Sequence, residues 1–330
     1  MKSTRSILKI GIKLGVAIVL IFFLLQMIDW RKSWDIAQSI SIESILIYVT
    51  LLVLGVGISA KKWEILAHFN GYRFPFFSYF RWYLAGTFIN NFLPSVVGGD
   101  TYRALVLGKK EGSRVHAVSS VIFDRYTGLV SMAILAVLFS LGNFSLVREN
   151  IFWLLLFFGA FLGILAQGLL LPGKKWSLFS FIFKFLPKKA EKVAESIEEY
   201  KDKRIITLSF LWGALFSFFG VGLVNYVLFS SVGVSLHFLD FLSVIFFINI
   251  IAAIPLSVNN IGIKEWAYYI FFGYFGVDPE ISVTVALVSR FLQMGVSLFA
   301  LPTVLAFSKE RRSGTIKELF NENEDLEKRA

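Results

Sequence analysis

Charged side chains stand deep inside long apolar stretches of this sequence, where a charge needs a partner. Asp124 and Arg125 lie together in one stretch, and Arg290 lies in another. At about 1.5 Å per helical residue, an arginine about ten residues into a helix lies near the middle of a bilayer. Arginine there costs roughly 2.5–3.5 kcal/mol unless it faces protein, water or an anion. The two arginines could therefore bind an anionic ligand or form buried ion pairs.

Two further acids, Asp100 and Glu265, are candidate partners for these arginines. Asp124 is adjacent to Arg125, but neighbouring residues on a helix point about 100° apart and pair poorly. We therefore expect Arg125 and Arg290 to reach Asp100 and Glu265, either within one half of the chain or across the two halves. Ion pairs that only hold the fold together would give the same pattern.

Both acids stand beside a break in an apolar segment. The segments cover about 74–108 and 239–275, and their breaks read FLPSVVGGD over 92–100 and IPLSVNNIG over 254–262. Proline lacks a backbone N–H and glycine permits positive φ, so each segment is predicted to form two half-helices around a loop. The residues expected to shape these two hairpins are Pro94, Gly98, Gly99, Pro255 and Gly262.

After each break the chain resumes a helix, and a helix N-terminus inside the membrane favours an anion. Polar side chains in the breaks could bind the same ligand or could cap the half-helices. Two helix ends and a slight cationic excess suit a phosphate-bearing headgroup. The candidate substrate-binding residues are Arg125, Arg290, Asp124, Asp100, Lys264, Glu265, Asn260, Ser95 and Ser257.

The composition places these residues in a membrane protein. The chain has 330 residues, of which 56% are hydrophobic and 17% charged, whereas soluble proteins carry about 25% charged residues. Six stretches are long enough to cross about 30 Å of hydrocarbon. We therefore predict an all-α polytopic integral membrane protein with about six transmembrane helices and two re-entrant, broken-helix hairpins. The six stretches cover about 8–28, 42–60, 115–141, 151–171, 205–230 and 281–307.

The distribution of basic residues predicts the orientation. If both broken segments return to the side they enter from, 26 of the 33 Lys and Arg residues fall on one side and 3 on the other. Basic residues concentrate on the cytoplasmic side. We expect a cell-membrane protein with both termini in the cytoplasm. The first apolar stretch is too long for a signal peptide and lacks an A-x-A cleavage site, so it is predicted to be a retained helix.

Similar spacings around the two breaks predict an inverted repeat within one membrane domain, 1–330. Each unit reads span, broken segment and span with an internal arginine: unit one covers 42–141 and unit two 205–307. A connecting helix and basic cytoplasmic linker (142–204) joins them, and 308–330 forms a cytoplasmic tail. The two hairpins then open toward opposite membrane faces, as in many transporters, whose substrate site lies between the repeats near the midplane.

Several other classes of function find no support. The sequence has no Cys, and its three His residues are far apart, so we expect no metal. It contains no GxxxxGK[ST], HExxH or GxSxG motif, so we expect no cofactor and assign no catalytic residue. The net charge of +10 fits a membrane surface, and we expect no nucleic-acid partner. The pattern leaves the oligomeric state open.

The residues at the breaks resemble the flippase-like membrane region of lysylphosphatidylglycerol synthases. The motif reads LPSVVGGDTYR over 93–103 and continues with Asp124–Arg125, and the likeness extends from about residue 40 to 307. Lys264 and the segment 257–259 depart mildly from the family pattern. The second half contributes Ile254–Pro255, Asn260, Gly262, Glu265 and Ser289–Arg290.

This resemblance implies that the protein moves lipid between leaflets, and it adds Arg103 to the candidate substrate-binding residues. The soluble aminoacyl-transferase domain of the full synthases is not part of this sequence, so lipid lysylation is not expected. Our leading hypothesis is transport of a lipid with an anionic headgroup. An intramembrane transferase, or an accessory subunit acting on lipid-linked substrates, is one alternative, and it needs a carboxylate near the headgroup. A small-molecule or ion transporter is the other.

Overall fold

The computed structural model describes residues 2–92, 98–110, 113–141, 159, 192–193, 195–197, 199–253 and 257–312. Every regular element within these residues is a helix, which confirms the predicted all-α class. The helices are α1 (Lys2–Met27), α2 (Trp30–Ser39), α3 (Ile42–Phe69), α4 (Phe76–Phe92), α5 (Gly98–Lys110), α6 (Arg114–Ser140), α11 (Lys203–Leu215), the π-helix η2 (Phe216–Leu223), α12 (Val224–Ser231), α13 (Phe238–Ala252), the short η3 (Val258–Asn260), α14 (Ile263–Gly273), α15 (Pro279–Ser297), the short η4 (Leu298–Ala300) and α16 (Leu301–Arg312).

Four helical stretches are long and apolar enough to cross a bilayer: α3, α6, the continuous helix Lys203–Ser231 and the continuous helix Pro279–Ser308. A fifth results if Leu14–Met27 and α2, which meet at an angle of 88°, count as one span. These stretches correspond to five of the six predicted spans. The sixth, 151–171, lies outside the described residues, as do Pro94, Ser95, Pro255, most of the connection over 142–204 and the tail after Arg312.

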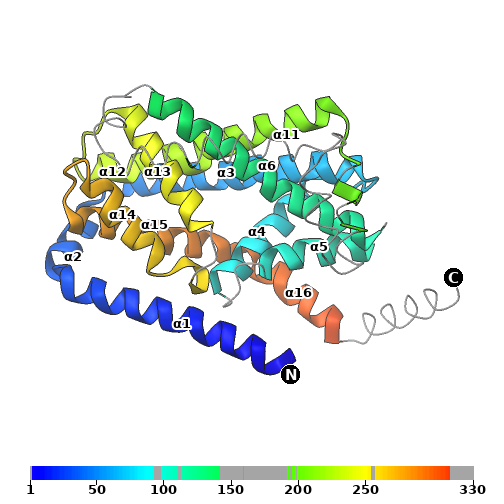
Figure 1. The fold of residues 1–330 in the computed structure, drawn as a ribbon, viewed down its shortest axis with the longest axis horizontal. Helices are drawn as coiled ribbons and strands as arrows, with labels where there is room; N and C mark the ends of the chain where they lie inside the picture. Colours follow the sequence, from blue (N-terminus) through cyan, green and yellow to red (C-terminus); the bar gives the residue numbers. More distant parts are fainter. Residues whose placement is uncertain are drawn as a thin grey trace, which may run out of the picture.

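The bend between α1 and α2 was not predicted, and the sequence explains it locally. Asp29 caps α2 by accepting hydrogen bonds from the backbone N–H groups of Arg31 and Lys32, which starts a new helix in a new direction. Lys32 then forms an ion pair with Asp278, with 2.6 Å between Nζ and Oδ2. This contact holds α2 beside the turn between α14 and α15 (Figure 1).

Two helical hairpins, the first formed by α4 and α5 and the second by α13 and α14, open toward opposite ends of the bundle (Figure 1). The open end of the first lies where α3 ends, because the Tyr72 hydroxyl donates to the Ser113 carbonyl across it at 2.6 Å. The open end of the second lies beside α2, where α3 begins. Their closed ends meet in the middle, where the Asn259 side chain donates to the Asn91 carbonyl at 3.3 Å.

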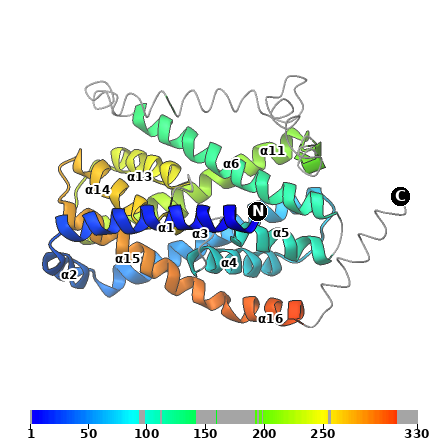
Figure 2. The same ribbon diagram turned by 60° about the horizontal axis from the view of Figure 1, so that its bottom comes forward.

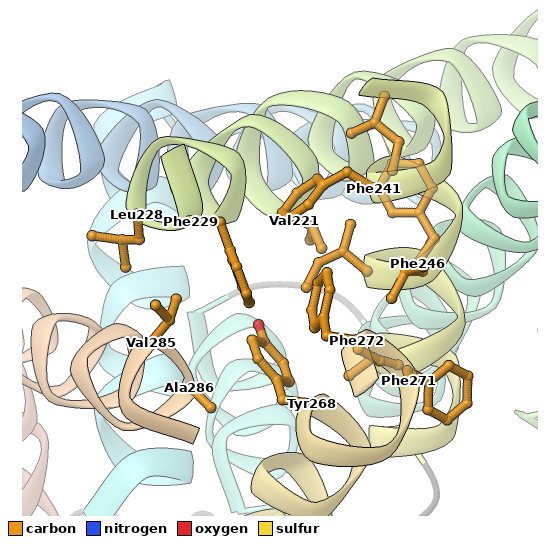
Figure 3. Close-up of a cluster of buried hydrophobic side chains, with 14 of the residues drawn as sticks. Val221, Leu228, Phe229, Phe241, Phe246, Tyr268, Phe271, Phe272, Val285 and Ala286 are labelled. Atoms are coloured by element: carbon orange, nitrogen blue, oxygen red, sulfur yellow. The ribbon is translucent and has the colours of Figure 1, made fainter. Parts of the chain in front are cut away.

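A large apolar core packs the second hairpin against α3, α6, α12 and α15. Aromatic side chains from three helices meet there, and the rings of Phe229 and Phe272 lie 4.2 Å apart (Figure 3). Tyr268 is fully buried and donates its hydroxyl to the side chain of Asn225 at 2.7 Å. The core therefore fixes the position of α14, which carries two of the candidate site residues.

Helix α1 lies along the outside of the bundle (Figures 1 and 2). Its contacts reach the second hairpin: the Trp266 indole donates to the Leu20 carbonyl at 3.0 Å. Gly262, with φ +84°, lies against the same residue, and an added Cβ would meet the Leu20 Cβ at 2.6 Å. Glycine is therefore required here by both backbone conformation and space.

Candidate functional site

Arg125 and Asp100 form the ion pair that joins α6 to the first hairpin. The guanidinium donates through Nε to Asp100 Oδ2 at 2.9 Å and through Nη2 to Oδ1 at 3.1 Å. Such a two-point contact fixes both side chains. The Nη1 group of Arg125 has no partner among the described residues, and 51% of this side chain remains exposed. Arg125 is therefore held in place while one of its edges stays available.

Asp124 points into a second, fully buried network. Its Oδ2 accepts from Arg103 Nη2 at 2.7 Å, and its Oδ1 lies 3.1 Å from Lys62 Nζ. The Arg103 guanidinium also lies between the rings of Trp63 and Tyr83, whose centroids are 4.3 and 4.2 Å away. All members of the ion-pair network are almost inaccessible, so it joins α3, α5 and α6 rather than facing a ligand.

The second half repeats the first arrangement. Arg290 donates through Nε to Glu265 Oε1 at 2.8 Å and through Nη1 and Nη2 to the carbonyls of Asn259 and Asn260. In both halves the acid precedes its arginine by 25 residues. Both arginines are the twelfth residue of their helix, counting from Arg114 and from Pro279. The arginines thus pair with the predicted acids, and each pair lies within one half.

The residues of the breaks are used mainly to hold the hairpins. Asn90 Oδ1 accepts the Gly99 N–H at 2.8 Å, and Glu265 Oε2 accepts the Gly262 N–H at 2.8 Å. These N–H groups, expected to face an anion, are therefore already occupied. Ser257 donates to the Ile261 carbonyl at 2.9 Å within the break, and the Asn260 amide donates to the carbonyl of Ala252, the last residue of α13.

Close backbone contact explains the glycines of the first break. A Cβ on Gly99 would lie 2.0 Å from the Gly86 carbonyl oxygen, so only glycine lets α5 cross α4 there. Gly98 is the first residue of α5. Asp100 and Arg103 follow within the first turns of this helix, and the crossing therefore positions both for their ion pairs.

Lys264 differs from the other candidate cations because no acid pairs with it among the described residues. Its Nζ lies 3.5 Å from Ser289 Oγ and 5.5 Å from the centre of the Tyr268 ring. The two halves together place five cations (Lys62, Arg103, Arg125, Lys264 and Arg290) around three carboxylates (Asp100, Asp124 and Glu265). The region thus has more positive than negative groups, as an anion-binding site requires.

A cavity of about 290 Å³ lies between the two hairpins and the helices that carry them. One cation from each half lines it, Arg125 from the first and Lys264 from the second, whereas Arg290 does not. No carboxylate occurs among the described lining residues. The uncharged polar side chains on its wall are Tyr83, Thr87, Asn90, Asn91, Asn225, Asn249, Gln293 and Ser297.

Sequence reasoning missed several of these residues. The distribution of basic residues predicts Lys62 in a cytoplasmic stretch, but α3 continues to Phe69 and buries the lysine beside Asp124. Asn249 and Gln293 lie within apolar helices, whereas the predicted site rests on charged residues and on the polar residues of the two breaks. An amide within an apolar helix is the signal that could have identified them, since a buried amide needs hydrogen-bond partners.

Fold and site together define a class: a polytopic α-helical membrane protein with a cationic, amide-lined cavity between two opposed hairpins. Residues 10–300 match the family described as the lysylphosphatidylglycerol synthase TM region. The chain therefore belongs to this family. It is also 23% identical over 324 residues to a UPF0104 membrane protein of Methanocaldococcus jannaschii, covering 92% of this chain and 94% of the relative. No solved structure matches the chain.

Proposed function

We propose that this protein moves a lipid with a phosphate-bearing headgroup between the leaflets of the membrane. The headgroup would bind in the cavity between the hairpins while the acyl chains stay in the bilayer. We further propose that the units 42–141 and 205–307 form an inverted repeat, and that movement of one unit against the other opens the cavity to each leaflet in turn. Such alternation around a central site is common in transporters built from inverted repeats.

The observation that carries the proposal is the pair of cations on the cavity wall. Arg125 is fixed by Asp100 with one edge free, and Lys264 has no acidic partner among the described residues. An anion between them would balance charge that is otherwise costly inside a membrane. The cavity volume of about 290 Å³ suits a headgroup but not a whole lipid, since sites for drug-sized ligands cover roughly 300–1,000 Å³.

The anion would therefore meet a different pair of residues from the one expected at first. We assign the direct contacts to Lys264 and Arg125, and a supporting role to Arg290, whose three hydrogen bonds to Glu265, Asn259 and Asn260 shape the second break. The transferase alternative needs a carboxylate near the headgroup. In the described structure Asp100, Asp124 and Glu265 all lie in ion pairs, so nothing favours that alternative.

A reconstituted transport assay tests the proposal. Proteoliposomes containing acyl-labelled phosphatidylglycerol report leaflet exchange through quenching of the label by a membrane-impermeant reductant. We expect exchange faster than in protein-free vesicles, and a loss of about tenfold or more for Lys264→Met, because a hydrogen bond to a charged group contributes about 1.5–3 kcal/mol. The matched control is Lys201→Met, since Lys201 is exposed and does not line the cavity.

Two outcomes would contradict the proposal. Wild-type exchange no faster than in protein-free vesicles, across several anionic lipids, would remove lipid transport altogether. Equal rates for Lys264→Met and Lys201→Met would leave transport standing but exclude Lys264 as the anion-binding group. Size-exclusion profiles of both variants show whether a lost rate reflects lost folding.

A further inference from the structure

The cavity wall carries hydrogen-bond acceptors that a phosphate cannot satisfy. Asn249 donates its amide N–H to the Ile245 carbonyl at 2.7 Å, so its Oδ1 is left as an acceptor. Gln293 donates to the Tyr48 hydroxyl at 3.2 Å, and that hydroxyl donates onward to the Ser289 carbonyl. This chain of donors fixes the orientation of the Gln293 amide and leaves its Oε1 without a partner in the described structure.

Both amide oxygens, Asn249 Oδ1 and Gln293 Oε1, are accessible rather than fully buried in the protein. Neither is among the fully buried side-chain atoms of the described residues that lack a hydrogen-bond partner, and both residues line the cavity. A phosphate diester has only acceptor oxygens, so it pairs with Arg125 and Lys264 but offers nothing to these amides. The ligand needs donors of its own, because a polar group left unpaired on binding loses affinity.

The two cations on the wall, Arg125 and Lys264, determine which hydrogen-bond donors the ligand can carry. An ammonium group could donate to the amide oxygens, but it would bring a third positive charge into a cavity whose described wall has no carboxylate. Like charges in a site of low dielectric repel strongly. A hydroxyl donates the same hydrogen bonds without charge. Asn90 complements this wall, because its Oδ1 is used by Gly99 and its amide N–H groups remain to meet a hydroxyl or phosphate oxygen.

We infer that the cavity selects a hydroxyl-bearing phosphate headgroup, of the glycerol phosphate or sugar phosphate type, and discriminates against amine-bearing headgroups. This inference rests on the proposed transport function and specifies its substrate class. Arg125 and Lys264 hold the phosphate, and Asn249 and Gln293 accept hydrogen bonds from the hydroxyls.

Leaflet exchange of three acyl-labelled lipids tests the inference: phosphatidylglycerol, phosphatidylethanol, a phosphate diester that lacks the hydroxyls, and phosphatidylethanolamine, which carries an amine. We expect phosphatidylglycerol to move about tenfold faster than the other two, since a site that hydrogen-bonds a ligand hydroxyl rejects analogues without it. Isosteric Gln293→Met and Asn249→Leu should each reduce this preference about fivefold, because they slow the exchange of phosphatidylglycerol more than that of phosphatidylethanol. Gln26→Met, on the exposed outer surface of α1, is the matched control.

Gln293→Glu keeps the side-chain shape and places a carboxylate on the wall. We expect this variant to slow the leaflet exchange of phosphatidylglycerol and to accelerate that of phosphatidylethanolamine, because the added carboxylate can pair with an ammonium group. Equal wild-type rates for the three lipids, or Gln293 variants that leave the preference unchanged, would overturn the inference while lipid transport stands. Uptake of radiolabelled glycerol 1-phosphate without exchange of any lipid would support the site chemistry and overturn the lipid function.

Discussion

The two halves of this protein hold their arginines alike but differ in the residue before each arginine. In the first half that residue is Asp124, which is buried against Lys62 and Arg103. In the second half it is Ser289, whose hydroxyl lies 3.5 Å from Lys264 Nζ. The carboxylate pairs with the two extra cations of the first half, whereas the serine leaves Lys264 without an acid among the described residues. Each half thus keeps one cation on the cavity wall, but in the first half Asp100 pairs with that cation and a buried ion-pair network lies behind it.

Removal of the buried carboxylate should have the largest effect. We expect Asp124→Asn to lower the free energy of unfolding by about 3–5 kcal/mol, because Lys62 would lose its acid and Arg103 would keep only the longer contact with Asp100, at 3.4 Å. Ser289→Ala should cost only about 1 kcal/mol, the contribution of one hydrogen bond. Thermal unfolding of the purified proteins in detergent measures both. Similar losses for the two variants would contradict the contrast between the halves.

The glycines of the two breaks give the next comparison. Gly99→Ala should cost about 3 kcal/mol, because its Cβ would overlap the rigid Gly86 carbonyl at 2.0 Å and α5 would have to move. Gly262→Ala should cost about 1–2 kcal/mol: its φ of +84° strains alanine, but the clash is with Leu20 on the peripheral α1. Gly273→Ala, with no atom near its Cβ, is the control. A larger loss of unfolding free energy for Gly262→Ala than for Gly99→Ala would show that the second break depends more on close packing than the first.

A smaller effect is expected when the second half is given the charge pattern of the first. Ser289→Asp should pair Lys264 and slow leaflet exchange by about tenfold, the loss expected when one charged hydrogen bond to the ligand is removed. Folding should be retained, since the new acid gains a cation. Ser289→Asn, uncharged and of the same size, should keep at least half of the exchange that Ser289→Ala shows. Undiminished exchange in Ser289→Asp would mean that Lys264 does not hold the anion.

The sequence alone predicts the charged residues and the two hairpins, but it does not predict which acid pairs with which arginine. Charges within apolar stretches identified Arg125, Arg290 and their acids, and the proline and glycine patterns located both hairpins. The choice between pairing within a half and across halves depends on how each helix is rotated against its neighbour, which hydrophobic spacing does not specify. The sequence places Lys264 among the candidate substrate-binding residues but does not distinguish it from the other charges, because its lack of an acid among the described residues depends on the positions of all the others.

The length of α3 was the other unpredicted factor. Its apolar run gives no signal that the helix continues through Lys61 and Lys62 to Phe69, since lysines at the end of a span usually mark the membrane surface. The burial of Lys62 follows from Asp124 on the neighbouring helix α6. Long-range contacts of this kind decide whether a basic residue belongs to a loop or to a buried network.

A double-mutant cycle in the leaflet-exchange assay tests most directly whether cations from both halves hold one phosphate. Lys264→Met and Arg125→Gln should each slow phosphatidylglycerol by about tenfold or more; Asp100 still has Arg103 at 3.4 Å in the latter. Because both cations contact the same group, the double variant should be within about twofold of the slower single variant. If the double variant is slowed by the product of the two single-variant factors, Lys264 and Arg125 act independently. That result would contradict the proposal that both cations hold one phosphate.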